Sequence, residues 1–243
     1  MSLKPKDFET IYNHFNSPVS QGLDCGQFCA PLNQGEPVCC TTKHAIPIVD
    51  KAEFKLLKSR TDMWTKLKPF DEVSKALIKE HEPHCKAIEC NGARHCERDN
   101  RSVACRAFPF FPYLSKKRDI IGASIYWTFK DRCWVMSNLQ VVTKNYLDEL
   151  FENYRFIFSK DEDEENAFFE QSVQMRRLYS RKGWNIPILG LDGKAYHIKP
   201  KSEKLTPIKV SQLEKYFPFD SMKNYRREIK KMDGPTENLK LRP

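Results

Sequence analysis

The sequence predicts an α+β fold that is mainly helical and loop-rich, with a few short strands. Three observations favour this class. Apolar residues recur at helical spacing in several segments, β-favouring residues dominate one short run, and a Gly- and Pro-containing stretch near the N-terminus is typical of a loop. With 243 residues, of which 40% are apolar and 30% charged, the chain is long enough for one core and a smaller appended unit.

Four helices are predicted from apolar periodicity, at residues 51–59, 70–82, 144–158 and 167–183. The second is expected to stop at Pro83, and the fourth ends at Gly183 after Arg and Lys in its last turn. The acidic run at 161–165 is interpreted as a solvated helix N-terminus rather than a metal-binding loop.

A strand is predicted within 122–130, where Ile, Tyr, Trp, Thr and Phe accumulate. Further on, Asp192 and Gly193 stand between apolar residues and give the signal for a hairpin turn.

The C-terminal part of the chain is strongly basic. Residues 194–231 hold eleven Lys or Arg and four acidic residues, so they supply +7 of the formal net charge of +9. A helix is predicted at 221–232, followed by a frayed tail. Either this charge only favours solubility, or the segment contacts a nucleic acid, an acidic protein or anionic lipid.

No membrane span is expected, because the longest nearly apolar run, 120–129, has about half the length that a spanning helix needs. The first residues lack the apolar stretch of a secretory signal. We therefore expect a cytoplasmic protein, in which disulfides rarely persist. Neither G-x-G-x-x-G nor G-x-x-x-x-G-K-[ST] occurs, so nucleotide binding has no sequence support.

Cysteines are concentrated in one part of the chain. Eight of the nine lie between residues 25 and 105: Cys25, Cys29, Cys39, Cys40, Cys85, Cys90, Cys96 and Cys105. Their neighbours are mostly polar or charged, which favours thiolate metal ligands over small buried hydrophobes, with disulfides and catalytic or inert thiols as alternatives. Cys133, in RCWVM, is equally well explained as a buried hydrophobe. We therefore expect the fold to be organised around a cysteine-ligated metal centre.

The spacing of the cysteines leaves the metal open. The first four form C-x3-C-x9-C-C in a loop, and Cys39 and Cys40 either meet at one metal through a tight turn or serve two metals. Eight thiols fit a [4Fe-4S] iron–sulfur cluster or more than one metal as well as one zinc. His84 and His95 each precede a cysteine and are candidate ligands, although a supporting or surface histidine is commoner.

The stretch RSVACRAFP, residues 101–109, is similar to R-P-x-x-C-R-x-F-P of a bacterial cysteine-cluster family. Together with the loop that ends in CC, it resembles the YkgJ-like family of zinc- or iron-chelating CxxCxxCC proteins. A related cluster in flagellin lysine methylases is associated with an iron–sulfur cluster. The resemblance implies that Cys96 and Cys105 are metal ligands and that Arg101 and Arg106 are supporting cations. It also implies that the loop cysteines complete the cluster: Cys25, Cys29, Cys39 and Cys40.

The resemblance covers roughly residues 20–135 and departs from the family pattern in three places. An insertion, APLNQGEPV, separates Cys29 from Cys39; Ser102 replaces the usual Pro; and ERDN, one residue shorter, stands where the family tends to have an aromatic residue. These departures keep the cysteines and leave the identity and number of metals open.

Three regions are expected: a metal-binding cysteine-cluster region (1–135), a helical region with a short hairpin (136–218), and a basic C-terminal helix and tail (219–243). The favoured function is a metal-binding protein that holds an iron–sulfur cluster or zinc. One alternative is a cluster-dependent, methylase-like protein-modifying enzyme, which would need general acids or bases such as His44, Glu36 or Tyr126 beside the cysteines. The other is a zinc-stabilised adaptor that binds a nucleic acid or protein partner through the basic C-terminal region.

Overall fold

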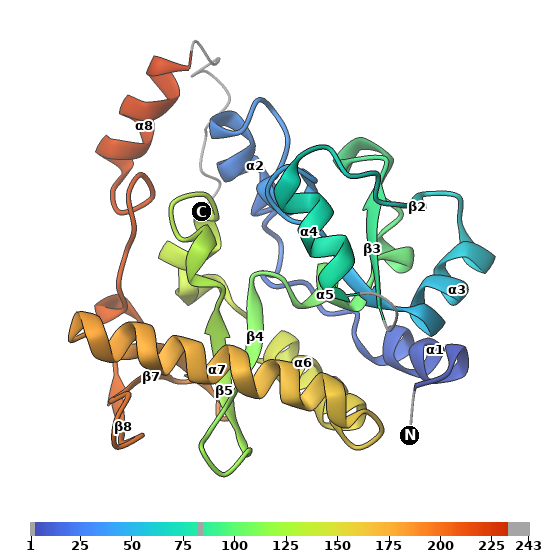
Figure 1. The fold of residues 1–243 in the computed structure, drawn as a ribbon. Helices are drawn as coiled ribbons and strands as arrows, with labels where there is room; N and C mark the ends of the chain where they lie inside the picture. Colours follow the sequence, from blue (N-terminus) through green and yellow to red (C-terminus); the bar gives the residue numbers. More distant parts are fainter. Residues whose placement is uncertain (1–2, 82–84, 233–243) are drawn as a thin grey trace.

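The computed structural model describes residues 3–81 and 85–232 (Figure 1). Its α-helices are α1 (Pro5–His14), α2 (Gly26–Cys29), α3 (Lys51–Arg60), α4 (Glu72–His81), α5 (Val103–Ala107), α6 (Lys144–Phe158), α7 (Glu162–Lys182) and α8 (Met222–Lys231). Short 3₁₀ turns are η1 (Ala30–Leu32), η2 (Val38–Cys40), η3 (Ala93–His95), η4 (Arg98–Asn100), η5 (Trp127–Phe129), η6 (Trp134–Ser137), η7 (Leu139–Val141) and η8 (Val210–Gln212). Within this part of the chain, no helix has the length and apolar character needed to cross a bilayer.

The strands form two antiparallel sheets. The smaller sheet has the order β1-β3-β2, built from β1 (Ile48–Asp50), β2 (Trp64–Lys66) and β3 (Cys85–Cys90). The larger follows the chain from β4 (Phe110–Leu114) through β5 (Ile120–Ile125), β6 (Ile186–Gly190) and β7 (Ala195–Ile198) to β8 (Leu205–Ile208). Helices α6 and α7 are inserted between β5 and β6.

The mainly helical, loop-rich fold expected from the sequence is wrong. Of the residues that the structure describes, 48% are helical, with the 3₁₀ turns included, and 16% form strands, arranged in sheets of three and five strands. The fold is also not organised around a cysteine-ligated metal centre: in residues 3–81 and 85–232, no three His, Cys, Asp or Glu side chains are placed to hold a metal ion. Strands such as β3, β7 and β8 were not predicted from the sequence because they are short. They also contain Lys, Glu, His or Pro, which obscure the alternation of polar and apolar residues.

The inserted helices cover the part of the larger sheet formed by β4, β5 and β6, one on each face. Phe110 of β4 joins the core with side chains of α6, whereas Phe111 and Tyr113 pack with Met175 and Tyr179 of α7. Successive side chains of a strand point to opposite faces, so α6 and α7 lie on opposite sides of β4. Figure 1 shows α7 crossing in front of the strands with α6 behind them. All five residues of β4 and of β6 are consequently buried.

Most of the predicted elements are confirmed. α3 and α6 cover the segments 51–59 and 144–158, and α4 begins two residues later than the predicted 70–82 and reaches 81, the last residue described there. α7 begins earlier than predicted, because the side chain of Asp161 accepts the Glu164 N–H and the acidic run forms the first turn. Gly183 ends α7 in the left-handed region, at φ 68°. In the hairpin of β6 and β7, Gly193 takes φ 76°.

The predictions at 122–130 and 221–232 are confirmed in part. The strand at 122–130 ends at Ile125 and is followed by η5. The predicted C-terminal helix is α8, which begins after Ser221; the tail from 233 and His84 lie outside the described residues.

One main core runs through the described chain, from Leu3 to Ile229, and includes residues of all three expected regions. At one side of it, the carboxylate of Glu53 is buried, with 3% of the residue exposed. Its Oε1 atom accepts hydrogen bonds from the Tyr12 hydroxyl and the Val103 N–H, both at 2.7 Å. Burial raises the pKa of Glu53 to about 7, and these two hydrogen bonds act against that rise.

Arg106 is the second buried charge of this region, with 4% of the residue exposed. Its guanidinium lies 4.6 Å from the ring centre of Tyr12. It donates to four groups: the carbonyls of Arg101 and Asp99 at 2.9 and 2.8 Å, the Asn16 side chain at 2.8 Å, and the carbonyl of Phe15. The end of α1 is thereby fixed to the loop that connects Cys96 to Cys105.

Replacing Glu53 by Gln should change how stability depends on pH. Folding raises the pKa of Glu53, so between the two pKa values the native protein keeps a proton that the unfolded chain releases. The contribution of Glu53 to the stability of the fold is therefore fully present below about pH 4.5 and is lost as the pH rises to about 7. At about 1.4 kcal/mol per pKa unit, wild type should lose roughly 3 kcal/mol relative to E53Q across this window. Urea unfolding at pH 4 and pH 8 measures the difference. The exposed Glu9→Gln control should track wild type, and an E53Q profile parallel to wild type would contradict the assignment.

Replacing Arg106 by Lys should destabilise the fold. Lysine cannot span the four acceptors, so buried carbonyls lose their donors, which costs about 3 kcal/mol. The free energy of unfolding in urea gives the loss directly. The exposed Arg98→Lys variant is the matched control and should change stability by less than about 0.5 kcal/mol; equal effects of the two substitutions would refute the structural role of Arg106.

Candidate metal centre

The loop that carries the first four cysteines is folded into two short helical turns. Two of these cysteines flank α2 and two end η2: Cys25 and Cys29, then Cys39 and Cys40. A methyl group on Gly26 would lie 2.9 Å from the ring of Pro37. The absence of a side chain at Gly26 therefore lets α2 pack directly against the start of η2.

Cys39 and Cys40 lie in a tight turn rather than in extended backbone. Their Sγ atoms are 3.9 Å apart. The hydrogen bond between them lowers the pKa of Cys40 and raises the pKa of Cys39. Cys40 is therefore favoured as the thiolate of the pair.

Cys90, Cys96 and Cys105 approach Cys40 from other segments. Cys90 ends β3, Cys96 follows η3, and Cys105 lies on α5, where its N–H donates to the Ser102 hydroxyl at 3.3 Å. Burial is the main cause that raises the pKa of each of the three thiols, and negative charge on Cys40 adds to it in each case. Charges act over a limited range, so Cys40 lies within electrostatic range of these three thiols.

The two arginines predicted as supporting cations lie in different places. The hydrogen bond with Cys39 is the main cause of the lowered pKa of Cys40, and burial is the main cause of the raised pKa of Cys96 and of Cys105. Positive charge on Arg101 lowers the pKa of all three thiols. Arg106 instead donates to carbonyls beneath the loop. Arg101 is therefore the guanidinium that accompanies the thiols.

Cys85 is placed away from the other thiols. It begins β3 opposite Asp50, whereas Cys90 ends the same strand opposite Trp64. At about 3.4 Å per residue the two cysteines are separated by about 17 Å. Burial raises the pKa of Cys85 to about 11, and the charges that add to it are carboxylates, with Glu164 first. The structure thus separates Cys85 from the predicted ligand set.

Cys133 lies beside the loop cysteines. It is buried, with 6% of the residue exposed, and directly precedes η6. Phe28, next to Cys29, stacks on Trp134, next to Cys133, with ring centres 4.3 Å apart. Burial raises the pKa of Cys133, and the charges of Cys29 and Cys25 follow as the next causes. Sequence reading missed this neighbourhood, because an apolar flank such as RCWVM is also typical of a cysteine that only packs.

Glu36 adds an acidic group near Cys40. Its Oε2 atom is buried and, among the described residues, has no hydrogen-bond partner. Its charge raises the pKa of Cys40, although the hydrogen bond from Cys39 and burial have larger effects. The other oxygen of this carboxylate, Oε1, faces the Arg94 guanidinium at 3.9 Å, so Oε2 is the atom that could accept from a further donor or cation.

All nine cysteines are free thiols. Seven predicted ligands gather in one region together with Cys133, but within the described ranges no three side chains converge to a coordination geometry. His95 is exposed, and His84 falls in the gap at 82–84. Metal binding would therefore require the thiol side chains to turn toward a common point.

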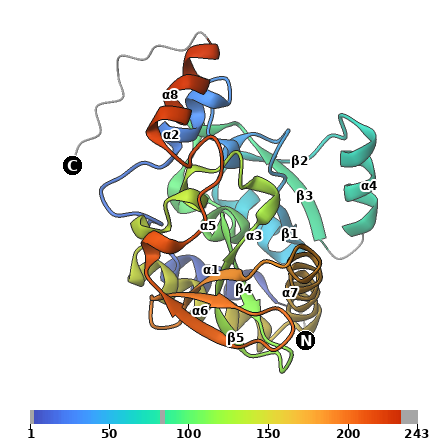
Figure 2. The same cartoon turned by 90° about the vertical axis from the view of Figure 1, so that its left-hand side faces the viewer.

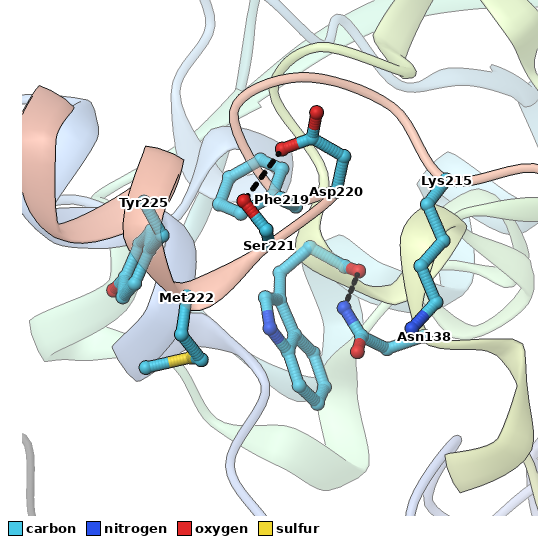
Figure 3. A pocket seen from close by; sticks show the side chains of 8 residues that line it. Asn138, Lys215, Phe219, Asp220, Ser221, Met222 and Tyr225 are labelled. Carbon is cyan, nitrogen blue, oxygen red and sulfur yellow. Dashed lines mark hydrogen bonds between the residues drawn. The ribbon is translucent and has the colours of Figure 1, made fainter.

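Of the three candidate acid–base groups, only Glu36 acts on a cysteine in the way described above, and His44 and Tyr126 are engaged elsewhere or stay protonated. His44 is engaged on both ring nitrogens, with Asn33 at 3.0 Å and Arg132 at 2.7 Å, and burial lowers its pKa. Burial raises the pKa of the Tyr126 hydroxyl, so it stays protonated. A small pocket of about 100 Å³ between η6 and the start of α8 is lined by groups such as Asn138, Asp220 and Ser221, without a cysteine (Figure 3).

A function can be argued from three features of this region: the thiols around Cys40, the charge of Arg101 and the Glu36 oxygen without a hydrogen-bond partner.

Comparison of the chain with protein-family models, with curated proteins and with solved structures gave no match.

Proposed function

We propose that this protein binds an iron–sulfur cluster, or zinc as the alternative occupant, through Cys40, Cys90, Cys96 and Cys105. The observation that supports the proposal is that the charge of Cys40 acts on the thiols of Cys90, Cys96 and Cys105, which come from segments far apart in sequence. Thiolates are the ligands that both occupants take from proteins. Membership of the YkgJ-like cysteine-cluster family is part of the same proposal.

The charges around these four thiols support binding of a metal. A divalent ion with four thiolates carries an excess of two negative charges, and Arg101 is placed to offset part of it. Glu36 provides a further oxygen for a cation or for a hydrogen-bond donor. Without metal, neutral thiols can pack as small apolar groups, and Cys90 and Cys105 do pack against the main core. The site is therefore a local addition to a fold whose core is apolar.

A second function, nucleic-acid binding, is favoured by helix α8. Tyr225 and Ile229 are buried, and the Tyr225 hydroxyl donates to the Phe28 carbonyl of α2 at 2.8 Å. Figures 1 and 2 both show α8 beside α2. On the side of α8 away from these contacts, five basic residues are exposed: Lys223, Arg226, Arg227, Lys230 and Lys231. We propose that this face contacts the phosphates of a nucleic acid.

The metal proposal predicts what anaerobically purified protein contains. Elemental analysis should find stoichiometric iron with acid-labile sulfide and a sulfur-to-iron charge-transfer absorption, or else zinc. Cys96→Ser should lose most of this metal, because a tetrathiolate site needs four ligands. Cys85→Ser should retain it, because Cys85 lies at the other end of β3. The proposal would be wrong if folded wild-type protein contained no metal, or if the two variants lost metal equally. Circular dichroism shows whether each variant is folded.

The nucleic-acid proposal predicts salt-dependent binding that involves α8. Fluorescence anisotropy with labelled single-stranded RNA and duplex DNA should show an affinity that falls as salt rises. Replacing Lys223, Arg226 and Lys230 together by Gln should weaken binding and reduce the salt slope by roughly three. The matched control replaces Lys51, Lys55 and Lys58 of α3, which are equally exposed and remove the same charge. Binding that is independent of salt, or lowered equally by the control, would exclude the α8 face.

A further inference from the structure

Two large aromatic side chains are exposed on the side of the molecule that carries helix α8. Trp184, in the turn after α7, is 45% exposed, and Phe217, in the segment that leads to α8, is 48% exposed. Figure 1 shows the C-terminal end of α7 and helix α8 on the same left-hand side, joined by the segment between β8 and α8. A single exposed ring needs no explanation, but these two share further features that indicate a contact surface.

Trp184 is held in place by two neighbouring rings. It is T-shaped to Tyr179 in the last turn of α7, with ring centres 5.8 Å apart, and its ring centre lies 6.4 Å from that of Trp127 in η5. Tyr179 is buried, and so is the Nε1 atom of Trp127. The exposed ring of Trp184 is therefore ordered before any ligand binds, which lowers the entropy cost of binding.

A cation lies over each of the two exposed rings. The Lys182 ammonium is 4.9 Å from the ring centre of Trp184, and the Arg227 guanidinium of α8 is 5.7 Å from that of Phe217. Lys130 adds a third cation at 5.0 Å from the Trp127 ring. Ring faces attract cations through their quadrupole. Flat apolar surface and positive charge are thus combined at the same positions.

Phe217 connects this aromatic surface to the basic face of α8. The preceding residue, Tyr216, lies within electrostatic range of Tyr179, on which Trp184 packs: burial raises the pKa of Tyr179, and the charge of Tyr216 adds to the rise. On its other side, Phe217 is in contact with Arg227, one of the exposed basic residues of α8. The two rings and the basic face therefore belong to one side of the molecule.

Positive charge dominates the segment that includes Phe217 and α8. Residues 213–231 hold six Lys or Arg and three acidic residues. Each acidic residue has a partner within the protein: Glu214 with His197, Asp220 with Asn224, and Glu228 with Arg227 and Lys231. The basic residues in excess are available for an anionic ligand.

We propose that this side of the molecule binds single-stranded nucleic acid, with bases stacked on Trp184 and Phe217. The phosphates lie against the cations over these rings and against the basic face of α8. The inference rests on the proposed nucleic-acid function of α8 and names the form of nucleic acid that is bound. Bases in a duplex are already stacked on one another, so only unpaired bases can offer their faces to protein rings.

Anionic lipid is the other partner that aromatic and basic side chains together can bind. A membrane contact would bury the rings of Trp184 and Phe217 among the lipids, and the cations over their faces would have to leave or be buried with them. In a single strand a phosphate accompanies each base, so the same cations keep an anionic partner beside the stacked ring. The position of the cations therefore favours nucleic acid.

The test measures fluorescence anisotropy of the full-length protein with labelled single-stranded oligouridine of about 12 nucleotides and with a duplex of the same length. Wild type should bind the single strand at least about tenfold more tightly. Trp184→Ala and Phe217→Ala should each weaken single-strand binding roughly tenfold and leave the salt slope and the duplex affinity unchanged, because they remove a stacking surface and no charge. Trp184→Phe keeps a flat ring and should keep most of the affinity.

The matched control is Phe70→Ala. Phe70 precedes α4 and is 51% exposed, and Figures 1 and 2 show α4 apart from α8. This variant should bind the single strand as wild type does. Circular dichroism shows whether each variant is folded, and Trp184→Phe keeps the test decisive should Trp184→Ala fail to fold.

The outcomes separate this inference from the proposed function. Unchanged single-strand affinity in one ring variant removes that ring from the surface, and unchanged affinity in both, or tighter binding of the duplex, overturns the stacking. In those cases, loss of binding in the α8 triple variant still supports the nucleic-acid function. Absence of binding to either nucleic acid overturns both. Binding to phosphatidylserine-containing vesicles alone, lost in Trp184→Ala, also overturns both and assigns the surface to lipid.

Discussion

The burial of Arg106 is the constraint on which the arrangement of the thiols depends. Its guanidinium binds the carbonyls of Asp99 and Arg101 on one side and groups at the end of α1 on the other. Glu53 fixes the start of α5 from the same core through the Val103 N–H. A buried guanidinium is stable only when its donors are satisfied, so the course of the chain from 96 to 105 is set by these bonds. Cys96 and Cys105 are thereby held at the edge of the core.

The loop that carries Cys96 and Cys105 is held by the apolar core and its buried charges, so its position does not depend on a bound metal. In small zinc modules the metal supplies the folding free energy, because the chain has too few apolar groups for a core. Here a main core extends from Leu3 to Ile229, and β4, β5 and β6 of the larger sheet are covered by α6 and α7. Several of the thiols belong to that core or pack against it: Cys25, Cys29, Cys90, Cys105 and Cys133. A metal bound as we propose would therefore add to a fold whose apolar core is formed by other residues.

Apolar periodicity in the sequence predicted where the long helices lie, but it did not predict the strands of the two sheets. α6 has both its bounds at the predicted residues, since Thr143 caps its start and its apolar face repeats over four turns. β7 and β8, by contrast, contain His197 and Pro207 and are only partly buried, so their residues do not alternate in the expected way. In the smaller sheet, β1 pairs with β3 across 35 to 39 residues of sequence and β2 pairs with β3 across 22 to 26, contacts that no local pattern reports.

Sequence spacing likewise does not predict which cysteines lie close together in the fold. Spacing alone treats Cys85 and Cys90 as a C-x4-C pair, which in a loop or turn would meet at one metal. In β3 the intervening residues are extended, so the five-residue step carries the sulfurs to opposite ends of the strand and, being odd, to opposite faces of the sheet. Cys133 is the converse case, because it is 93 residues from Cys40 in sequence and reaches the loop through the stacking of Trp134 on Phe28. The ligand set of such a site is therefore decided by the conformation between cysteines, and their spacing in sequence gives only the candidates.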